Sequence, residues 1–288
     1  MDAGNAVTGG RLVRRALALV VLFGLSLGHP AAAQSLWDNL LVGVELAIGE
    51  SVAQSVRDEY GGPARLTRAE QQRIERVFAD IVAQAGRKEI AYNLTVLESD
   101  VVNAFAAPGG RIFLTTGLLR EIANDIDALA NVLGHEVAHV EHKHGMSAVA
   151  RQLGLGLLLQ FFFGQSDDVV QQVAAFIMEL TRLGWSREQE HDSDALGQEL
   201  AAAAGYDPQG MVRFFERLSE LQGQEIAFLE FLSTHPLTSD RIERARARAS
   251  VLQSGPRPDV QAQDPGTGAP EAGAGGDGGA RVITRVRP

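Results

Sequence analysis

Two histidines and a glutamate in the segment His135-Glu136-Val137-Ala138-His139 have the spacing of a metal-binding motif. The surrounding apolar residues recur at helical spacing, and positions four residues apart lie on one face of a helix. The two imidazoles can therefore bind one ion, while Glu136 lies beside them, where it contacts a metal-bound water rather than the metal. This is the geometry of the H-E-x-x-H motif, which predicts a zinc site.

A catalytic zinc ion takes three protein ligands and keeps its fourth position open, so a third ligand must come from elsewhere in the chain. Metzincins would have glycine at position 142 and histidine at position 145. This sequence has His142 and Gly145 instead, which excludes that subclass. The other common solution is a glutamate on a later helix, followed four residues on by an aspartate.

Glu190 and Asp194 have this second spacing. Glu190 is predicted to bind the zinc. Asp194, one helical turn on, would accept the second N–H of a zinc-binding histidine and so fix its tautomer. Glu188 and Asp192 have the same spacing, so spacing alone leaves the register open.

The other histidines near these motifs are not predicted to be ligands. His142 lies on the same helical face but about 4.5 Å beyond His139, from the rise of ~1.5 Å per residue, and three ligands from one straight helix cannot complete a tetrahedron. We expect His142 and His144 to be surface or second-layer residues, and His144 to lie near the helix end, where the dipole favours it. His191 is expected to face solvent.

The predicted ligands hold one Zn²⁺ per chain and imply hydrolysis. Zinc lowers the pKa of its bound water from ~16 towards ~7. Glu136 would accept the proton of that water as general base and later deliver it to the leaving amine. Glu136→Gln should therefore keep the metal and lose hydrolysis.

Sequence periodicity predicts two helices ahead of a short strand-rich segment. The first covers Ser35 to Tyr60 and ends at Gly61-Gly62-Pro63. Thr67 and Glu70 form a capping box that starts the second, which Gly86 ends.

The strand-rich segment is followed by a mainly helical region. Strands are predicted at Ala91–Leu97, Val101–Ala106 and Arg111–Thr116, with a turn at Pro108-Gly109-Gly110. From Gly117 to Gln253 the chain is predicted to be helical. The expected fold class is α+β, mainly helical, with a small antiparallel β-sheet of three strands beside the zinc-site helices.

Residues 1–33 have the features of a secretory signal peptide. Three arginines precede the apolar stretch Ala16–Gly28, and Ala31-Ala32-Ala33 offers a cleavage site after Ala33. The apolar stretch is too short to span a bilayer as a helix, although an uncleaved membrane anchor is the alternative. We expect an exported, periplasmic protein that is cleaved after Ala33 and whose zinc metallopeptidase domain covers residues 34–253.

Residues 254–288 are rich in glycine and proline and are expected to form a disordered tail. The final basic, β-prone segment Arg281–Arg287 is expected to be solvated, with strand addition to a partner as the alternative. The net charge of −10 argues against nucleic-acid binding. The absence of cysteine excludes disulfides, zinc–thiolate sites and cysteine nucleophiles.

Several segments together resemble the gluzincin peptidases that include CAAX prenyl protease, HtpX and the periplasmic β-barrel-assembly-enhancing protease. The resemblance runs from about residue 60 to 250 and rests on Asn103–Phe113, Thr116–Leu119, Leu133–Val140, His144-Gly145, Ser186–Asp194, Ser233–Pro236 and Arg241-Ile242. It implies a zincin-like peptidase domain. The pattern Ser-Arg-x-x-Glu-x-x-x-Asp in this family assigns the third ligand to Glu190.

The resemblance also implies roles for residues outside the zinc motif. An edge strand near the zinc would pair with the substrate backbone, either Val101–Ala106, which includes Asn103, Ala104 and Phe105, or Arg111–Thr115, with a plain scaffold hairpin as the alternative. His235 would occupy the open zinc position as an inhibitory ligand, or stabilise the oxyanion, and Arg241 is a second candidate for a regulatory or oxyanion role.

Three functions are compatible with these features. The leading prediction is a zinc metalloendopeptidase that hydrolyses unfolded or misassembled envelope proteins, a substrate class implied by the resemblance. The alternative is a mostly silent, His235-gated protease that acts as a periplasmic chaperone, and the apolar stretch Leu153–Gly164 is then a candidate contact with membrane or client protein. A structural zinc protein would need a closed four-ligand site.

Overall fold

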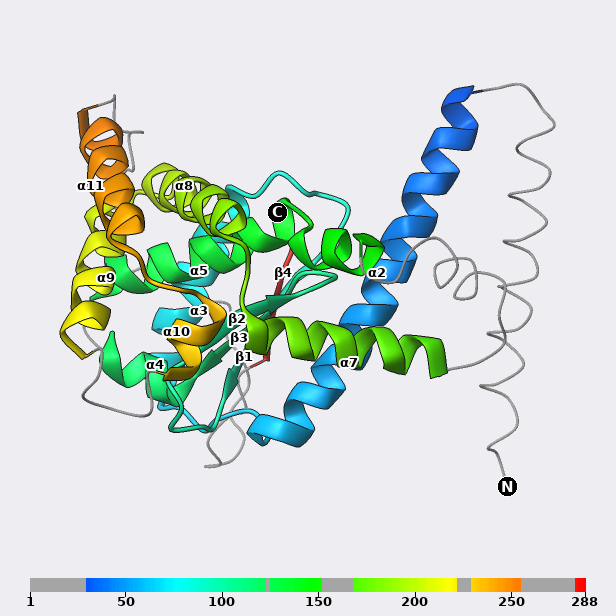
Figure 1. The fold of residues 1–288 in the computed structure, drawn as a ribbon, viewed down its shortest axis with the longest axis horizontal. Coiled ribbons are helices and arrows are strands. Elements are labelled where there is room, and N and C mark those ends of the chain that lie inside the picture. Colours follow the sequence, from blue (N-terminus) through cyan, green and yellow to red (C-terminus); the bar gives the residue numbers. More distant parts are fainter. Residues whose placement is uncertain (1–29, 123–124, 152–167, 222–228, 255–282) are drawn as a thin grey trace, which may run out of the picture.

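A four-stranded sheet lies at the centre of the computed structural model, which describes residues 30–122, 125–151, 168–221, 229–254 and 283–288 (Figure 1). Its strands are β1 (Tyr92–Leu97), β2 (Ala104–Ala107), β3 (Arg111–Thr115) and β4 (Ile283–Val286), in the order β2-β3-β1-β4. The first three strands lie where the sequence predicts them. The mainly helical α+β class is confirmed.

The sheet is mixed, whereas the sequence analysis predicted an antiparallel one. β2 and β3 form the expected antiparallel hairpin, with Phe105 opposite Phe113. β3 and β1 are parallel, with Leu94 opposite Ile112. The hairpin inserts β3 between β2 and β1, so β3 runs in the same direction as β1 and β2 stays at the edge.

Residues from the C-terminal tail form the opposite edge of the sheet. β4 is antiparallel to β1, with Val286 opposite Tyr92, and Thr284 Oγ1 donates to Glu75 Oε1 at 2.9 Å. The expectation of a disordered, solvated tail is therefore wrong for Ile283–Val286. This β-prone segment pairs with backbone groups of β1 that an open edge would leave unpaired. Residues 255–282 lie outside the described part of the chain.

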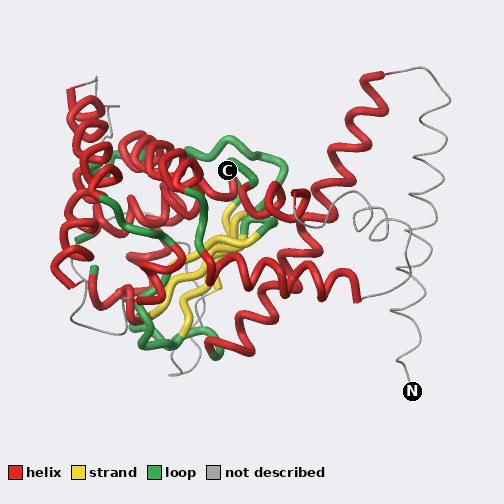
Figure 2. Tube along the Cα trace, viewed as in Figure 1, coloured by secondary structure: helices red, strands yellow, loops and turns green. Residues whose placement is uncertain are grey.

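Strand side chains alternate between two cores on opposite faces of the sheet, as the period of two requires. Ile112 and Leu114 belong to the larger core, and Phe105 and Phe113 belong to the smaller one. Figure 2 shows the strands between two groups of helices. The larger core is completed by residues of α3 (Arg68–Ala83), α5 (Ile126–Glu141), α8 (Arg187–Ala203), α9 (Gln209–Leu221) and α11 (Ser239–Ser254). The smaller core is completed by α2 (Pro30–Tyr60) and α7 (Asp168–Leu183).

Capping residues set the starts of the helices that carry the site. The predicted capping box of Thr67 and Glu70 begins α3. Asp125 caps α5 by accepting from the Ala128 amide at 2.9 Å, and Ser186 begins α8 with a second capping box. Two short helices, α4 (Thr116–Glu121) and α10 (Leu229–Thr234), complete the named elements.

Some predictions concern residues that the structure does not describe. Residues 1–29 of the predicted signal peptide and the apolar stretch Leu153–Gly164 lie outside the described residues. The predicted cleavage site after Ala33 falls at the start of α2. Among the helices in the described ranges, none is long and apolar enough to cross a membrane.

Candidate metal centre

The helices α5 and α8 cross at a contact between two glycines. A Cβ atom on Gly134 would lie 2.6 Å from the Gly197 carbonyl oxygen, and one on Gly197 would lie 2.6 Å from the His135 amide nitrogen. Only residues without a Cβ allow the two backbones to approach so closely. Glu190, about two turns before Gly197, is thereby brought against the face of α5 that carries the motif histidines.

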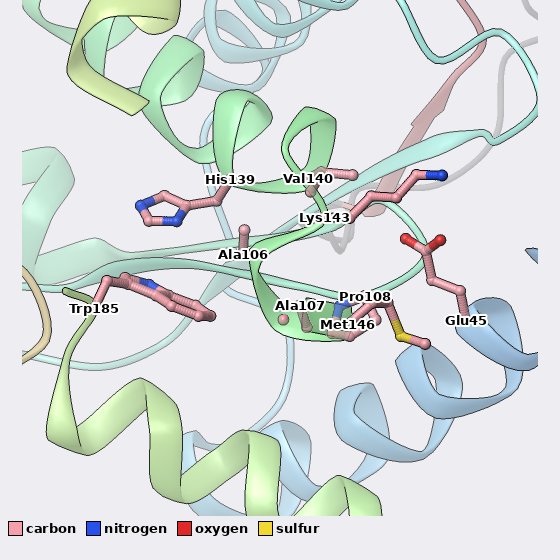
Figure 3. A pocket seen from close by; sticks show the side chains of 10 residues that line it. Glu45, Ala106, Ala107, Pro108, His139, Val140, Lys143, Met146 and Trp185 are labelled. Carbon is pink, nitrogen blue, oxygen red and sulfur yellow. The ribbon is translucent and has the colours of Figure 1, made fainter. Parts of the chain in front are cut away.

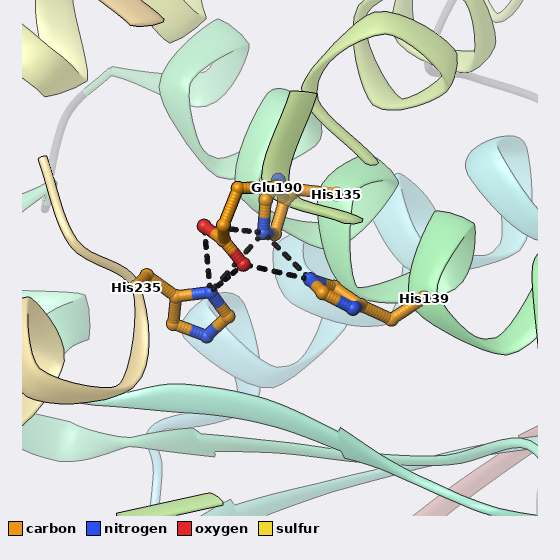
Figure 4. A group of neighbouring side chains, drawn as sticks. All are labelled: His135, His139, Glu190 and His235. Atoms are coloured by element: carbon orange, nitrogen blue, oxygen red, sulfur yellow. Dashed lines mark hydrogen bonds and ion pairs between the residues drawn. The ribbon is translucent and has the colours of Figure 1, made fainter. Parts of the chain in front are cut away.

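Four buried side chains converge at this crossing: His135, His139, Glu190 and His235 (Figure 4). His135 Nε2 lies 3.0 Å from His139 Nε2 and 3.2 Å from His235 Nδ1. Glu190 Oε1 lies 3.3 Å from His139 Nε2 and 3.0 Å from His235 Nδ1. One ligand atom from each of the four residues lies within 4.8 Å of the others.

These separations fit a single tetrahedral zinc ion. Zinc–nitrogen and zinc–oxygen bonds of about 2.0–2.1 Å place ligand atoms about 3.3 Å apart at the corners of a tetrahedron. Burial lowers the pKa of His139 well below its usual value, which makes this ring a neutral ligand with a free lone pair. The donor set of imidazole and carboxylate groups is one that zinc prefers.

The charges around the four clustered side chains also fit a bound cation. Burial opposes the charged form of His235, but the carboxylates of Glu190 and Glu136 outweigh it and raise the pKa of the ring. Glu190 keeps a pKa well below its usual value despite its burial, because His235 and Arg241 lie nearby. The site thus attracts positive charge.

Glu136 is the second buried carboxylate at the site. Neither of its oxygens has a hydrogen-bond partner in the described structure, and the residue is 1% exposed. Its one ion-pair contact there is with His235 Nε2, 3.6 Å from Oε1. Burial raises its pKa. A buried carboxylate that accepts no hydrogen bond is costly, so its retention beside the candidate ligands points to a group whose hydrogen bonds another molecule completes.

Asp194 and Arg241 form a layer behind the ligands. Asp194 Oδ1 lies 2.9 Å from His135 Nδ1, so the predicted pair is in contact, although without the alignment of a hydrogen bond. Arg241 donates to both oxygens of Asp194 at 2.7 Å and contacts Glu190 Oε2 at 2.6 Å. With a further hydrogen bond to the Pro236 carbonyl, the Arg241 guanidinium is therefore held against the carboxylates of Asp194 and Glu190.

His235 also contacts the edge strand. Its Nε2 lies 3.3 Å from the carbonyl oxygen of Ala104 in β2, so Nε2 is the donor and Nδ1 faces the metal position. The candidate substrate-strand residues Asn103 and Phe105 have buried side chains. The Asn103 amide donates to Glu230 Oε1 at 3.0 Å, and the Phe105 ring stacks on Phe113. These two side chains stabilise the fold, and only the backbone of β2 remains for pairing.

The structure separates the two registers that spacing alone left open. Glu188 and Asp192 are exposed, whereas Glu190 and Asp194 are buried at the ligand set. His142 is exposed, as expected. His191 is partly exposed and pairs with Asp240 at 3.0 Å rather than being free in solvent.

His144 is closer to the site than the sequence analysis recognised. It is buried, and its Nδ1 lies 2.9 Å from His139 Nδ1. Trp185, which no motif singled out, packs its ring 4.9 Å from that of His139. The sequence did contain a signal for Trp185, because a large apolar residue directly before a helix cap such as Ser186 commonly packs on a neighbouring element.

A small, partly open pocket with a cavity volume of about 10 Å³ lies beside His139, between β2 and the C-terminal end of α5 (Figure 3). Its walls are largely apolar, and Glu45 and Lys143 add one charge of each sign. The apolar lining consists of Ala106, Ala107, Pro108, Val140, Met146 and Trp185. The pocket therefore adjoins both the metal position and the edge strand.

Several known proteins are similar in sequence to this chain. Mitochondrial metalloendopeptidase OMA1 of Arabidopsis thaliana is 33% identical over 165 residues, which cover 57% of this chain and 33% of the relative. The OMA1 of Schizosaccharomyces pombe is 31% identical over 172 residues, covering 59% and 50%. Beta-barrel assembly-enhancing protease of Escherichia coli K12 is 27% identical over 236 residues, covering 78% and 47%.

This chain spans between a third and half of the length of these relatives. The model of peptidase family M48 matches residues 68–249, a range that contains the motif helix α5, the candidate ligand Glu190 and His235. With the ligand geometry and this match in agreement, the chain belongs to peptidase family M48, a family of zinc metallopeptidases.

Proposed function

We propose that this chain is a zinc-dependent endopeptidase in which His135, His139 and Glu190 bind the metal and Glu136 is the general base. The observation that carries the proposal is the buried carboxylate of Glu136, which accepts no hydrogen bond in the described structure, beside a tetrahedral set of candidate ligands. Bound zinc supplies a water of lowered pKa and polarises the scissile carbonyl. Glu136 accepts the proton of the attacking water and returns it to the leaving amine. Its burial favours this role, because a raised pKa suits both steps.

Replacement of Glu136 by glutamine tests this assignment. Glutamine keeps the shape of the side chain but accepts no proton, so zinc content should stay at the wild-type level. Hydrolysis of a fluorogenic peptide should fall by at least about 100-fold, the usual contribution of general base catalysis. Hydrolysis at the wild-type rate by the purified, zinc-loaded variant would remove Glu136 from the mechanism.

We also propose that the substrate backbone pairs with the free edge of β2. This strand is at the edge of the sheet. Its Ala104 carbonyl contacts Nε2 of His235, and the other ring nitrogen of His235 faces the metal position. Main-chain pairing of this kind gives affinity without side-chain selectivity. The small pocket beside His139 adjoins the metal position, and its apolar walls would favour contact with a small apolar substrate side chain next to the scissile bond.

For the biological role, we propose quality control of unfolded or misassembled envelope proteins after export. Support comes from the signal-like residues 1–33 and from the name of the relative that enhances β-barrel assembly. Cell fractionation should find the mature chain in the periplasm, with its N-terminus at Gln34. Unfolded casein should be degraded and a folded protein of equal size spared; retention of the chain in the cytoplasm would contradict this role.

A second candidate function is a protease that is mostly silent and holds client proteins as a chaperone. It is favoured by the position of His235, which completes the ligand set and also engages the Ala104 carbonyl. In this arrangement one ring nitrogen of His235 faces the fourth metal position. The other nitrogen contacts a backbone carbonyl that a bound substrate strand would need as its acceptor. All four clustered residues are buried, so a substrate must displace His235 before it reaches the metal.

Replacement of His235 by alanine separates gating from a direct catalytic role. If His235 only blocks the site, the variant should hydrolyse peptide several-fold faster than wild type; if it stabilises the oxyanion, the rate should fall. His191→Ala, which removes a histidine paired with Asp240 at the surface, is the matched control and should leave the rate unchanged. An unchanged rate in His235→Ala would exclude both roles. Protection of clients from aggregation by both wild type and Glu136→Gln would support the chaperone function.

A further inference from the structure

The chain reverses direction after α5 through a single residue in the left-handed region. Lys143 has a φ of 54°, the one positive φ among the non-glycine residues in the described ranges. Such a conformation costs roughly 1–3 kcal/mol and persists where the surroundings require it. Its amide donates to the Val140 carbonyl at 3.0 Å, so the turn stays tight against the helix end. The strained turn delivers His144, the next residue, back onto α5.

His144 is held in a defined place by this turn. The residue is buried, and its ring meets that of His139 at 73°, with centroids 5.0 Å apart. Trp185 flanks the ring at 6.0 Å, and Ser193 Oγ lies 3.5 Å from its Nδ1. The shortest polar contact of this ring in the described structure is the 2.9 Å between the Nδ1 atoms of His144 and His139.

The proton in this contact follows from the ligand geometry. His139 presents Nε2 to the other ligands, at 3.0 Å from His135 Nε2 and 3.3 Å from Glu190 Oε1. A neutral imidazole that offers the lone pair of Nε2 carries its proton on Nδ1. At 2.9 Å, His139 Nδ1–H therefore donates to His144 Nδ1, whose own proton is on Nε2.

We propose that His144 is a positioning residue that fixes the tautomer and ring orientation of the zinc ligand His139. Its role parallels that of Asp194 toward His135, with a neutral acceptor in place of a carboxylate. Acceptors of this kind orient metal ligands and strengthen binding by about 10–100-fold. The inference rests on the proposed ligand set, and it assigns His144 as the residue that lies behind the ligand His139.

Two substitutions of similar size distinguish the acceptor from the bulk of the ring. The Oδ1 of asparagine is the same number of bonds from the backbone as Nδ1 of histidine, so His144→Asn keeps an acceptor near His139. His144→Leu fills the space without an acceptor, and His144→Gln places its carbonyl one bond too far. Zinc affinity is measured by competition with a chromogenic chelator, and thermal unfolding of the zinc-free proteins reports any purely structural loss.

The expected result is zinc affinity at least about 10-fold weaker for His144→Leu and His144→Gln, with His144→Asn remaining close to wild type. Equal affinity in all variants, or equal weakening in all three, would overturn the inference. His139→Ala is measured in parallel. If His139→Ala keeps wild-type affinity, the proposed ligand set itself is wrong; if it loses zinc while His144→Leu does not, only the role of His144 fails.

Discussion

At the scale of residues, the candidate ligands have a second layer of polar side chains behind them. Motif spacing predicts His135 and His139 because helical geometry fixes which residues share a face, whereas Glu190 was separated from Glu188 only by the family resemblance. The contact of Asp194 with His135 is predicted in the same way. The role of Arg241 required the structure, because the loop from His235 and the helix α11 bring it to Asp194 from 47 positions away in the sequence.

The buried pairing of Arg241 predicts that its shape matters more than its charge. Lysine cannot reach both oxygens of Asp194 and Glu190 at once, since it lacks the planar fork of a guanidinium. Arg241→Lys should therefore weaken zinc binding by roughly 10-fold or more, as second-layer changes do. Arg244→Lys is the matched control, because Arg244 is exposed and pairs only with Asp240 in the described structure. Equal zinc affinity in both variants would show that Arg241 does not position the ligands.

At the scale of elements, the close crossing of α5 and α8 sets the distance between the two halves of the ligand set. Periodicity and caps predict both helices, and the capping box of Thr67 shows that such local signals transfer well to the structure. The crossing itself was not predicted, because a glycine inside a helix does not reveal which backbone approaches it. Gly134 and Gly197 acquire their meaning only from their mutual contact.

The glycine contact predicts a position-specific effect of a single methyl group. In Gly197→Ala, the Cβ would lie 2.6 Å from the His135 amide nitrogen, so the helices must separate. The expected loss is about 1–3 kcal/mol of unfolding free energy, with weaker zinc binding. Gly43→Ala in α2 has no atom within 4 Å of its Cβ and should be neutral or slightly stabilising. Denaturant unfolding of both zinc-free variants checks this, and equal stabilities would contradict it.

The start of the motif helix α5 predicts a dependence of stability on acidity. Hydrogen bonds from Arg213 to the Asp125 carboxylate, at 2.5 and 2.9 Å, lower the pKa of Asp125 below its ordinary value of 3.8. A lowered pKa in the folded state contributes stability above the unfolded pKa, and this stability is lost as the pH falls through the folded pKa.

Asp125→Asn keeps a good N-cap but removes the charge. Wild type should be more stable than Asp125→Asn by a constant amount above about pH 5, and the difference should shrink below the unfolded pKa of 3.8. Asp125→Ala should lose a further ~1 kcal/mol at every pH through the lost cap. Chemical denaturation between pH 3 and 7 measures all three proteins, and a stability difference that does not change with pH would contradict the assignment.

At the scale of the whole molecule, a central sheet separates the helix pair α2 and α7 from the helices that carry the site. The sequence predicts the strands β1 to β3, since each is a short β-prone run beside a turn. Neither the parallel pairing of β1 with β3 nor the recruitment of β4 was predicted. Both depend on contacts between residues far apart in the chain, and in β4 about 190 residues separate the paired segments.

The position of β4 predicts separable effects of removing the end of the chain. Deletion of residues 283–288 exposes the edge of β1, so the protein should unfold more readily and self-associate. Zinc content should be unchanged, because β2, the strand beside the metal, is at the opposite edge. Arg287→Ala lies beyond the paired residues and is the control. Light scattering and thermal unfolding identical to wild type for the deletion would show that β4 does not protect the sheet.

The central claim is that two imidazoles of α5 and the carboxylate of Glu190 bind one zinc ion. The most direct test is the zinc content per chain of wild type, Glu136→Gln, His139→Ala and Glu190→Ala after dialysis against a weak chelator. The account predicts one zinc per chain in the first two proteins and little zinc in the last two. Full zinc content in folded His139→Ala and Glu190→Ala would contradict it.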